Sequence, residues 1–413
     1  MSSPRIIREW FLSLVVSSLM LPGAIAFATV FLFLTGPYGK DLNSAHWNSV
    51  LNRTPARACF FGALIALGFW VLLGLTTCRR FTRADAACPG PFDQLRQGFD
   101  DVKERLASVC PPSGAEDPPA ACREAAEHSA RLEGMFVQPA PVGLPWLLGT
   151  GYVDAWRRLH AIEESLLVLE SVPRVVQDAL TDEMRLSGSN IPQTPSLLKR
   201  LRAAVVSVSP PAAGYLMEAP PPVAATPEAE ARAALAQVRH AISEFRDGRR
   251  EALVRARNRL FATVIFSGIT GCTLLFVAIL SGAQKTEILG AAVFYLVGGI
   301  VGLVKELQSA ATGAPASQDD YGLGVVRLIQ TPLLAGLAAI GGVVLVKLTQ
   351  GPGTVFSLTD TFDVGENPYG LVAAAFFGLT PSLLLSSLQD RINQYRTDLS
   401  SSAAGNAQPG HVE

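Results

Sequence analysis

The chain has 413 residues, of which 49% are hydrophobic and only 17% are charged. The mean hydropathy of +0.30 argues against a wholly soluble protein of this length and indicates that a lipid bilayer is part of its surroundings. The formal net charge of −1 says little about partners, because positive and negative residues are segregated along the chain. Arginine far outnumbers lysine, and with abundant alanine, proline and glycine this is typical of a GC-rich bacterial genome.

Six segments are apolar and long enough to cross about 30 Å of hydrocarbon, which takes about 20 residues of helix. They run approximately over Phe11–Leu34, Ala58–Thr77, Leu260–Leu280, Ile288–Val304, Leu328–Val346 and Leu371–Leu388. The first follows Arg5 and Arg8 as a signal peptide would, but its apolar run continues to Leu34 without a break. We therefore expect a retained signal anchor.

The arginines and lysines at the segment ends predict the topology, because such residues favour the cytoplasmic side. Arg79 and Arg80 follow the second segment and Arg246–Arg259 precede the third, whereas the loop 348–369 has neither arginine nor lysine. One topology places every basic cluster in the cytoplasm. It predicts a multi-pass protein of the plasma (inner) membrane of a bacterium, with both the N- and C-termini cytoplasmic.

The predicted fold class is an all-α integral membrane protein with six transmembrane helices, two before and four after an all-α cytoplasmic helical domain. Apolar residues of the middle region recur at helical spacing, and no alternating run predicts a strand. The expected parts are an N-terminal transmembrane hairpin over 1–78, a cytoplasmic helical domain over 79–208, a proline- and alanine-rich linker over 209–231, a juxtamembrane amphipathic helix over 232–259, a four-helix transmembrane block over 260–390 and a disordered cytoplasmic tail over 391–413.

The arginine-rich end of the juxtamembrane helix predicts a membrane anchor. Glu244, Asp247 and Glu251 are interleaved with its arginines, which argues against a nucleic-acid arm. Upstream, Ile242 and Phe245 are expected to pack against the cytoplasmic bundle. The downstream arginines are unopposed and should contact lipid headgroups at about 1 kcal/mol each. With the pair after the second segment, the predicted lipid-headgroup and topology anchors are Arg255, Arg257, Arg259, Arg79 and Arg80.

The six cysteines do not predict a metal site. A metal reading would use Cys88, Cys110, Cys122 and His128, but their spacings are long and irregular and contain no C-x-x-C pair. Isolated reduced thiols are the favoured interpretation, and no metal or other cofactor is expected.

Enzymatic motifs are absent or weak, so the chain is predicted not to be an enzyme. Tyr321-Gly-Leu-Gly-Val is a lone G-x-G, which favours a flexible turn before a membrane helix. His160 and Glu164 are four residues apart and share a helix face, where they could form an acid–base pair. Arg157 and Arg158 adjoin them as ordinary ion-pair partners, which favours a solvated polar face.

The membrane block carries two kinds of pattern. Small residues at four-residue spacing favour close helix packing, within the block or between copies of it: Gly298 with Gly302, Ala338 with Gly342, and Ala374 with Gly378. Prolines near the ends of the fifth and sixth helices free backbone carbonyls beside polar side chains. The resulting candidate polar membrane site contains Gln330, Thr331, Pro332, Thr380, Pro381 and Ser382.

These features favour a non-enzymatic membrane scaffold or signalling protein whose cytoplasmic helical domain binds a partner. The alternative is a passive channel or transporter formed by oligomerisation of the last four helices, since a pore can gate without charges. Proton-coupled transport is disfavoured because no predicted span has an ionisable residue at its centre. The expected partners are membrane lipids and either a second copy or another protein, without nucleic acid. The sequence shows no resemblance to a characterised family.

Overall fold

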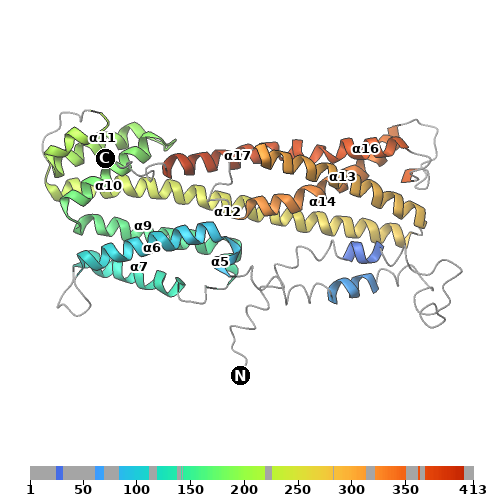
Figure 1. The fold of residues 1–413 in the computed structure, drawn as a ribbon, viewed down its shortest axis with the longest axis horizontal. Coiled ribbons are helices and arrows are strands. Elements are labelled where there is room, and N and C mark those ends of the chain that lie inside the picture. The colour runs from blue at the N-terminus through green and yellow to red at the C-terminus, as the bar shows by residue number, and fades with distance from the viewer. Residues whose placement is uncertain are drawn as a thin grey trace, which may run out of the picture. The chain divides into compact units, whose positions relative to one another are not determined.

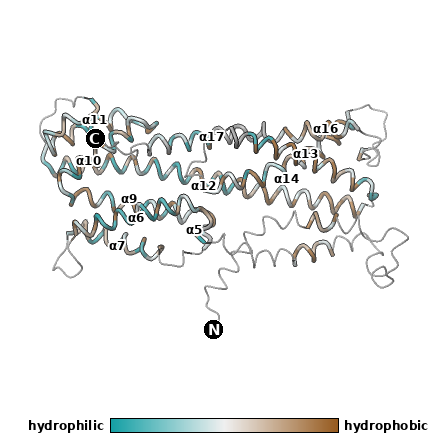
Figure 2. Tube along the Cα trace, viewed as in Figure 1, coloured by the Kyte–Doolittle hydropathy of each residue, from teal (hydrophilic) through white to brown (hydrophobic). Residues whose placement is uncertain are grey.

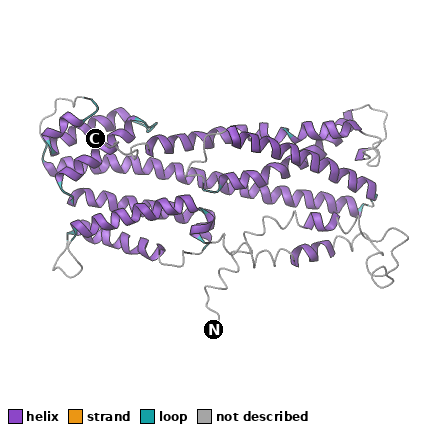
Figure 3. Cartoon of the chain, viewed as in Figure 1, coloured by secondary structure: helices purple, strands orange, loops and turns teal. Residues whose placement is uncertain are grey.

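Every regular element in the described part of the chain is a helix, and Figure 3 draws no strand there. This confirms the predicted all-α class. The computed structural model describes residues 25–30, 61–68, 83–110, 119–136, 141, 143–218, 226–281, 283–312, 321–349, 361–362 and 368–403.

The chain divides into two compact units. The first, which we call the apolar unit, comprises Met1–Thr82, Ala256–Pro315 and Gly322–Gln389. The second, which we call the charged unit, comprises Arg83–Arg255, Ala316–Tyr321 and Asp390–Glu413. Two helices contribute residues to both units, namely α12 (Glu228–Leu280) and α17 (Thr380–Ala403).

The charged unit is built from helices that follow the expected periodicity (Figure 1). In chain order, before α12, they are α5 (Ala84–Ala87), α6 (Pro89–Val109), α7 (Ala120–Phe136), α8 (Leu144–Leu148), α9 (Thr150–Leu169), α10 (Val172–Ser187), α11 (Thr194–Val208) and the 3-10 helix η1 (Pro210–Tyr215). In α6, Phe92, Leu95, Phe99 and Val102 form the buried stripe. Gly149, at φ 83°, lets the chain turn from α8 directly into α9.

The core of the charged unit extends into α12. Val238 and Ile242 are buried there with residues of α10 and α11, and Phe245 packs against the same cluster. The expected packing of Ile242 and Phe245 is therefore confirmed. The predicted linker over 209–231 is partly ordered: Ala212 of η1 and Ala231 of α12 are both in this core. Alanine is often fully buried, so an alanine-rich composition alone did not identify a linker.

The predicted tail over 391–413 also differs from the structure. Helix α17 continues to Ala403, and Ile392 and Leu399 are almost fully buried in the charged unit. Their seven-residue spacing places them on one face of the helix, which explains the burial. The polar composition of the exposed face concealed this stripe.

Three described helices are long and apolar enough to cross a membrane, which is compatible with a membrane protein. They are α12, Lys285–Gln308 of α13 (Lys285–Thr312) and Val326–Thr349 of α14 (Leu323–Thr349). In α12 the apolar part is the second half, which is brown in Figure 2 where the first half is largely teal. The predicted boundary at residue 259 is a change of composition within one continuous helix.

The other predicted spans differ in extent. The first two lie mostly outside the described residues, but helical pieces over 25–30 and 61–68 approach closely, and a Cβ added to Gly62 would lie 2.8 Å from Thr29 Cα. The sixth is interrupted: α16 (Pro368–Gly378) ends before Leu379, and α17 begins at Thr380. Pro381, in the first turn of α17, has no N–H to continue the helical hydrogen bonds of α16.

Small residues let α13, α14 and α16 approach closely in the apolar unit. A Cβ added to Gly298 would lie 2.3 Å from Ala339 Cβ and 2.8 Å from Ala335 O, and one added to Gly378 would lie 2.7 Å from Gly298 Cα. Ala374 is fully buried on the same side of α16. Packing of this kind is typical of helices in membranes.

Close contacts surround the predicted glycines of all three helices, but Ala338 of α14 is only half-buried. Gly302 faces Ala335, and a Cβ added to Gly342 would lie 2.1 Å from the Phe377 ring of α16. The face of α14 that packs on α13 is therefore Ala335 and Ala339. Four-residue spacing is satisfied by either pair of positions, so the sequence could not fix the rotation of α14.

We expect Gly298→Ala to lower the free energy of unfolding by about 1–3 kcal/mol, because its methyl group would overpack against α14. The matched control is Gly341→Ala, since a Cβ at Gly341 would meet nothing within 4 Å. Thermal unfolding of the full-length protein in detergent measures both variants. Equal melting temperatures for the two variants would contradict close packing at Gly298.

Candidate functional site

Residues 245–250 of α12 contact α9 on one side and α17 on the other, all within the charged unit. We call this cluster the α12 joint. Because a helix turns about 100° per residue, neighbouring side chains face different helices. The α12 joint consists of Phe245, Asp247, Arg249 and Arg250 on α12, Trp156 and His160 on α9, and Tyr395 and Asp398 on α17.

A buried carboxylate forms the α9 side of the joint. His160 Nδ1 lies 3.1 Å from Asp247 Oδ2, and Arg250 Nη1 donates to Asp247 Oδ1 at 3.1 Å. The exposed fractions of His160 and Asp247 are only 5% and 6%. Both oxygens of Asp247 therefore have a partner, as a buried carboxylate requires.

Arg250 is also stacked on an aromatic ring. Its guanidinium carbon lies 3.8 Å from the ring centroid of Trp156, and its side chain is among the largest that are fully buried. Trp156 is in turn 5.7 Å from the His160 ring. The indole face and the carboxylate of Asp247 together stabilise a cation that burial would otherwise make costly.

The pKa of Asp247 is lowered by its two partners, which keeps the buried carboxylate ionised. Burial alone would raise this pKa, but the hydrogen bond and charge interaction with His160 and the charge of Arg250 outweigh burial and lower it below its ordinary value. A general acid or base works best with a pKa near the operating pH. Asp247 is thus suited to holding two helices together as an anion and not to transferring protons at neutral pH.

Arg249 forms the α17 side of the joint. Its Nη2 lies 2.9 Å from Asp398 Oδ2, and Asp398 has an exposed fraction of 1%. Asn190 Nδ2 donates to Asp398 Oδ1 at 3.3 Å. The guanidinium of Arg249 also contacts two rings, at 4.8 Å from the Phe245 centroid and 5.0 Å from that of Tyr395. These contacts attach the end of α17 to α12.

A second charge network joins α6, α10 and α12. Arg105 makes a bidentate pair with Glu170 at 2.8 and 2.9 Å and also donates to Asp178 at 2.7 Å. Arg239 of α12 bridges Asp178 at 3.1 Å and Asp182 at 2.9 Å. Burial opposes ionisation of Asp178, but Arg239 and Arg105 outweigh it and lower the pKa. The same carboxylates raise the pKa of Arg239 against the effect of its burial.

The acid–base pair considered from the sequence is not brought together. His160 contacts Asp247, whereas Glu164 lies 3.1 Å from His240 Nδ1. The expected solvated polar face is also wrong for His160, which is buried. The two arginines adjoining this pair have other partners: Arg157 binds Glu251 and Arg158 binds Asp154. The packing of α12 on α9 decides these pairings, and spacing within α9 cannot show it.

The predicted arginine anchors have different environments. Arg259 is exposed, and Arg255 is exposed but pairs with Glu251 at 3.1 Å, so it is not unopposed. Arg257 is buried, with an exposed fraction of 3%, and its guanidinium lies 5.7 Å from the Phe261 ring. A surface headgroup contact is therefore wrong for Arg257. Arg79 and Arg80 lie outside the described residues.

The polar membrane site is only partly assembled. Gln330 is buried and donates from Nε2 to Thr263 Oγ1 of α12 at 2.8 Å. A Cβ added to Gly302 would lie 3.5 Å from the Thr331 methyl carbon, so Thr331 takes part in helix packing beside Pro332. Thr380 is half-buried, and no described contact links it to Gln330. The side chains of Pro381 and Ser382 lie outside the described residues.

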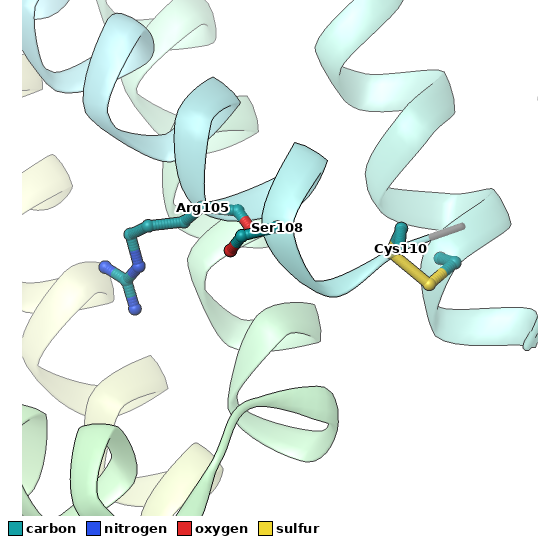
Figure 4. The surroundings of a disulfide bond; sticks show 4 residues. Arg105, Ser108 and Cys110 are labelled. Atoms are coloured by element: carbon teal, nitrogen blue, oxygen red, sulfur yellow. A yellow bond between two sulfur atoms is a disulfide. The ribbon is translucent and has the colours of Figure 1, made fainter. Parts of the chain in front are cut away.

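The expectation of isolated thiols is wrong for two cysteines. Cys110 and Cys122 form a disulfide, with their Cα atoms 5.8 Å apart (Figure 4). The available signal was their position on either side of the connection between α6 and α7, but spacing alone does not favour this pair over other pairs of cysteines. Within the described residues no group of three or more His, Cys, Asp or Glu side chains could hold a metal ion.

Comparison with known proteins adds no family to this description. No protein-family model, curated protein or solved structure matches the chain. The helices and the α12 joint therefore carry the functional argument.

We expect the charged unit to lose stability in acid. Asp247 and Asp178 both have pKa values lowered from 3.8, so their stabilising contribution is fully present above about pH 4 and is lost as the pH falls through the native values. In a background with Trp10, Trp47 and Trp70 replaced by phenylalanine, the fluorescence of buried Trp146 and Trp156 during urea unfolding reports this unit.

The unfolding midpoint should vary little between about pH 7 and 5 and fall steeply below about pH 4. The exposed pair of Asp154 with Arg158 gives the control. Asp154→Asn should leave the curve almost unchanged, because an exposed pair contributes about 0–1 kcal/mol. A midpoint that stayed constant down to about pH 2 would show that the buried carboxylates are not preferentially ionised in the folded state.

Proposed function

We propose that this chain is a non-enzymatic scaffold or signalling protein of the bacterial inner membrane, with six transmembrane helices and the charged unit in the cytoplasm. In this role the charged unit binds a protein partner. The α12 joint links that event to the membrane helices. The observation that carries the proposal is the contact of Arg249 with Asp398, which joins α12 to α17 inside the charged unit.

These two helices are the ones that lead from the charged unit into apolar sequence. Helix α12 continues without interruption into the apolar residues 260–280, and α17 follows α16 after a single residue. A partner that changes the position of either helix in the charged unit therefore acts on a helix that also belongs to the apolar unit. Allosteric coupling needs a physical connection of this kind.

The electrostatics of the joint support a mechanical role over a chemical one. Asp247 is paired on both oxygens, and Arg250 is enclosed between Asp247 and Trp156. Buried charges that neutralise one another specify one arrangement of helices, because removing either partner leaves an uncompensated charge. Such a joint resists partial movement and favours discrete arrangements.

The packing of the apolar unit favours a scaffold over a passive pore. Gln330, a polar side chain of the candidate membrane site, is buried against Thr263 of α12, and Gly298 of α13 packs closely on Ala335 and Ala339 of α14. Solute flux through liposomes containing the purified full-length protein tests this choice. Selective flux that Gln330→Leu abolishes would replace the scaffold with a channel.

We expect Arg249 and Asp398 to be strongly coupled. In a double-mutant cycle with Arg249→Met and Asp398→Asn, the coupling free energy should be about 1–3 kcal/mol, because both groups lie in a poorly solvated contact. Urea unfolding of the full-length protein measures each variant. The control cycle uses Lys103 and Glu133, an exposed pair at 2.6 Å, where coupling should be about 0–1 kcal/mol.

The partner-binding proposal has its own test. A photoreactive residue at Tyr215, which is 76% exposed in the charged unit, should give one discrete adduct when native membranes are irradiated. Asp398→Asn should change the adduct yield severalfold, whereas Glu133→Gln should not. Failure of Tyr215 and of the exposed residues Met184 and Val168 to give any adduct would contradict a partner on this unit.

A further inference from the structure

The disulfide lies at the junction of two helices. Cys110 is the residue after α6, and Cys122 is in the first turn of α7; they are 12 residues apart in sequence. Figure 4 shows Cys110 at the end of α6, with its bond directed toward α7 and away from the side chain of Arg105. The bond thus fixes the start of α7 to the end of α6.

The two sulfur atoms differ in access. Cys122 is buried, with an exposed fraction of 4%, whereas Cys110 is only partly buried. Attack by an external thiolate at the more exposed Cys110 would displace Cys122. Thiol–disulfide exchange needs this kind of access to one sulfur.

The two sulfur atoms also differ in electrostatics. Cys122 lies in the first turn of α7, where the positive end of the helix dipole stabilises negative charge. Cys110 is at the opposite end of a helix, with its N–H already donated to Leu106 O at 2.9 Å. The charge that develops on the Cys122 sulfur as it leaves is therefore at the favourable end of a helix.

The proposed cytoplasmic location of the charged unit predicts that this disulfide is reversible. The placement of the charged unit in the cytoplasm rests on the flanking arginines, and cytoplasmic disulfides in mesophiles are typically transient, catalytic or redox-sensing. We propose that Cys110 and Cys122 form a reversible redox site that responds to hydroperoxides. The inference rests on the cytoplasmic placement in the proposed function but not on the binding of a partner.

The reaction balances with two reagents. The Cys110 thiol loses its proton, and the thiolate attacks a hydroperoxide oxygen; the O–O bond breaks, a sulfenic acid forms, and an alcohol or water leaves with that proton. The Cys122 thiolate then attacks the Cys110 sulfur; the S–O bond breaks, and the hydroxide takes the proton lost by Cys122 and leaves as water. A cytoplasmic dithiol reverses the reaction. One of its thiolates attacks the Cys110 sulfur and releases the Cys122 thiolate; its second thiolate then attacks the mixed disulfide, which releases Cys110 and leaves the dithiol as a disulfide. Each cycle moves two electrons.

The state of the bond should control the start of α7. The end of α7 is held to α6 without it, since Phe136 lies 5.2 Å from the Phe99 ring and Lys103 pairs with Glu133 at 2.6 Å. In the described residues, the disulfide is the covalent link between α6 and the first turn of α7. Reduction should therefore loosen the first turns of α7 and leave its end in place.

The first test measures the bond in full-length protein within growing cells. Rapid acid quenching, alkylation and peptide mass spectrometry give the fraction of Cys110 linked to Cys122. Hydrogen peroxide should raise that fraction at least severalfold, and it should return to the starting value after the peroxide is removed. A fraction that stays near one or near zero throughout would overturn the redox site.

The second test separates this inference from the topology. In Cys122→Ser, a membrane-impermeant maleimide should label Cys110 in inverted vesicles and not in intact spheroplasts. Labelling from outside would overturn the cytoplasmic placement and with it both proposals. Labelling in inverted vesicles without peroxide-dependent bonding in the wild type would overturn the redox site alone.

The third test measures the structural consequence by hydrogen exchange of the full-length protein in detergent. Oxidation should slow exchange of amides in residues 120–125 by about tenfold or more, because the cross-link removes open states. Cys110→Ser should exchange like the reduced protein under both conditions. Ser108→Ala is the matched control, since Ser108 donates only to the Arg105 carbonyl on the same helix and should keep the full redox response. Equal exchange of oxidised and reduced wild type would overturn control of α7.

Discussion

Neutralisation of the buried Asp247 carboxylate is the constraint on which the charged unit depends. An ionised carboxylate away from water is costly unless each oxygen is bonded, and Asp247 meets this requirement with His160 and Arg250. Because His160 belongs to α9, the requirement fixes α12 against α9. Arg250 then needs its own enclosure, which Trp156 provides. One buried charge thereby determines the position of three further side chains and the rotation of two helices.

That rotation sets the other contacts of α12. Because Arg250 faces α9, Arg249 points about 100° away around the helix. There it forms an ion pair with Asp398 of α17. About three turns earlier, Arg239 meets Asp178 and Asp182 of α10, on the side of α12 that also buries Val238 and Ile242. The arginine-rich composition of α12 is therefore used mainly within the protein. Near the start of the apolar part, Arg255 and Arg259 are exposed.

Sequence periodicity predicted the helices well but predicted their partners poorly. The stripe from Phe92 to Val102 and the packing of Ile242 follow from helical spacing alone. The pairing of His160 with Asp247 spans 87 residues, and that of Asn190 with Asp398 spans 208. Such contacts depend on tertiary packing, which spacing within one helix does not encode. For the same reason the sequence did not predict that α14 packs on α13 through Ala335 instead of Ala338. Both alanines satisfy the small-residue spacing.

The disulfide joins α6 to α7, and the buried charge joins α12 to α9. Helix α7, whose start the disulfide holds, packs on α9, and α9 in turn binds α12 through His160. A contiguous path of packed helices thus connects Cys122 with the α12 joint inside the charged unit. Coupling along such a path requires an element with two discrete states. The oxidised and reduced forms of the cysteine pair would supply these states, and the rigidity of the neutralised Asp247 cluster would transmit a change in α9 to α12 instead of absorbing it.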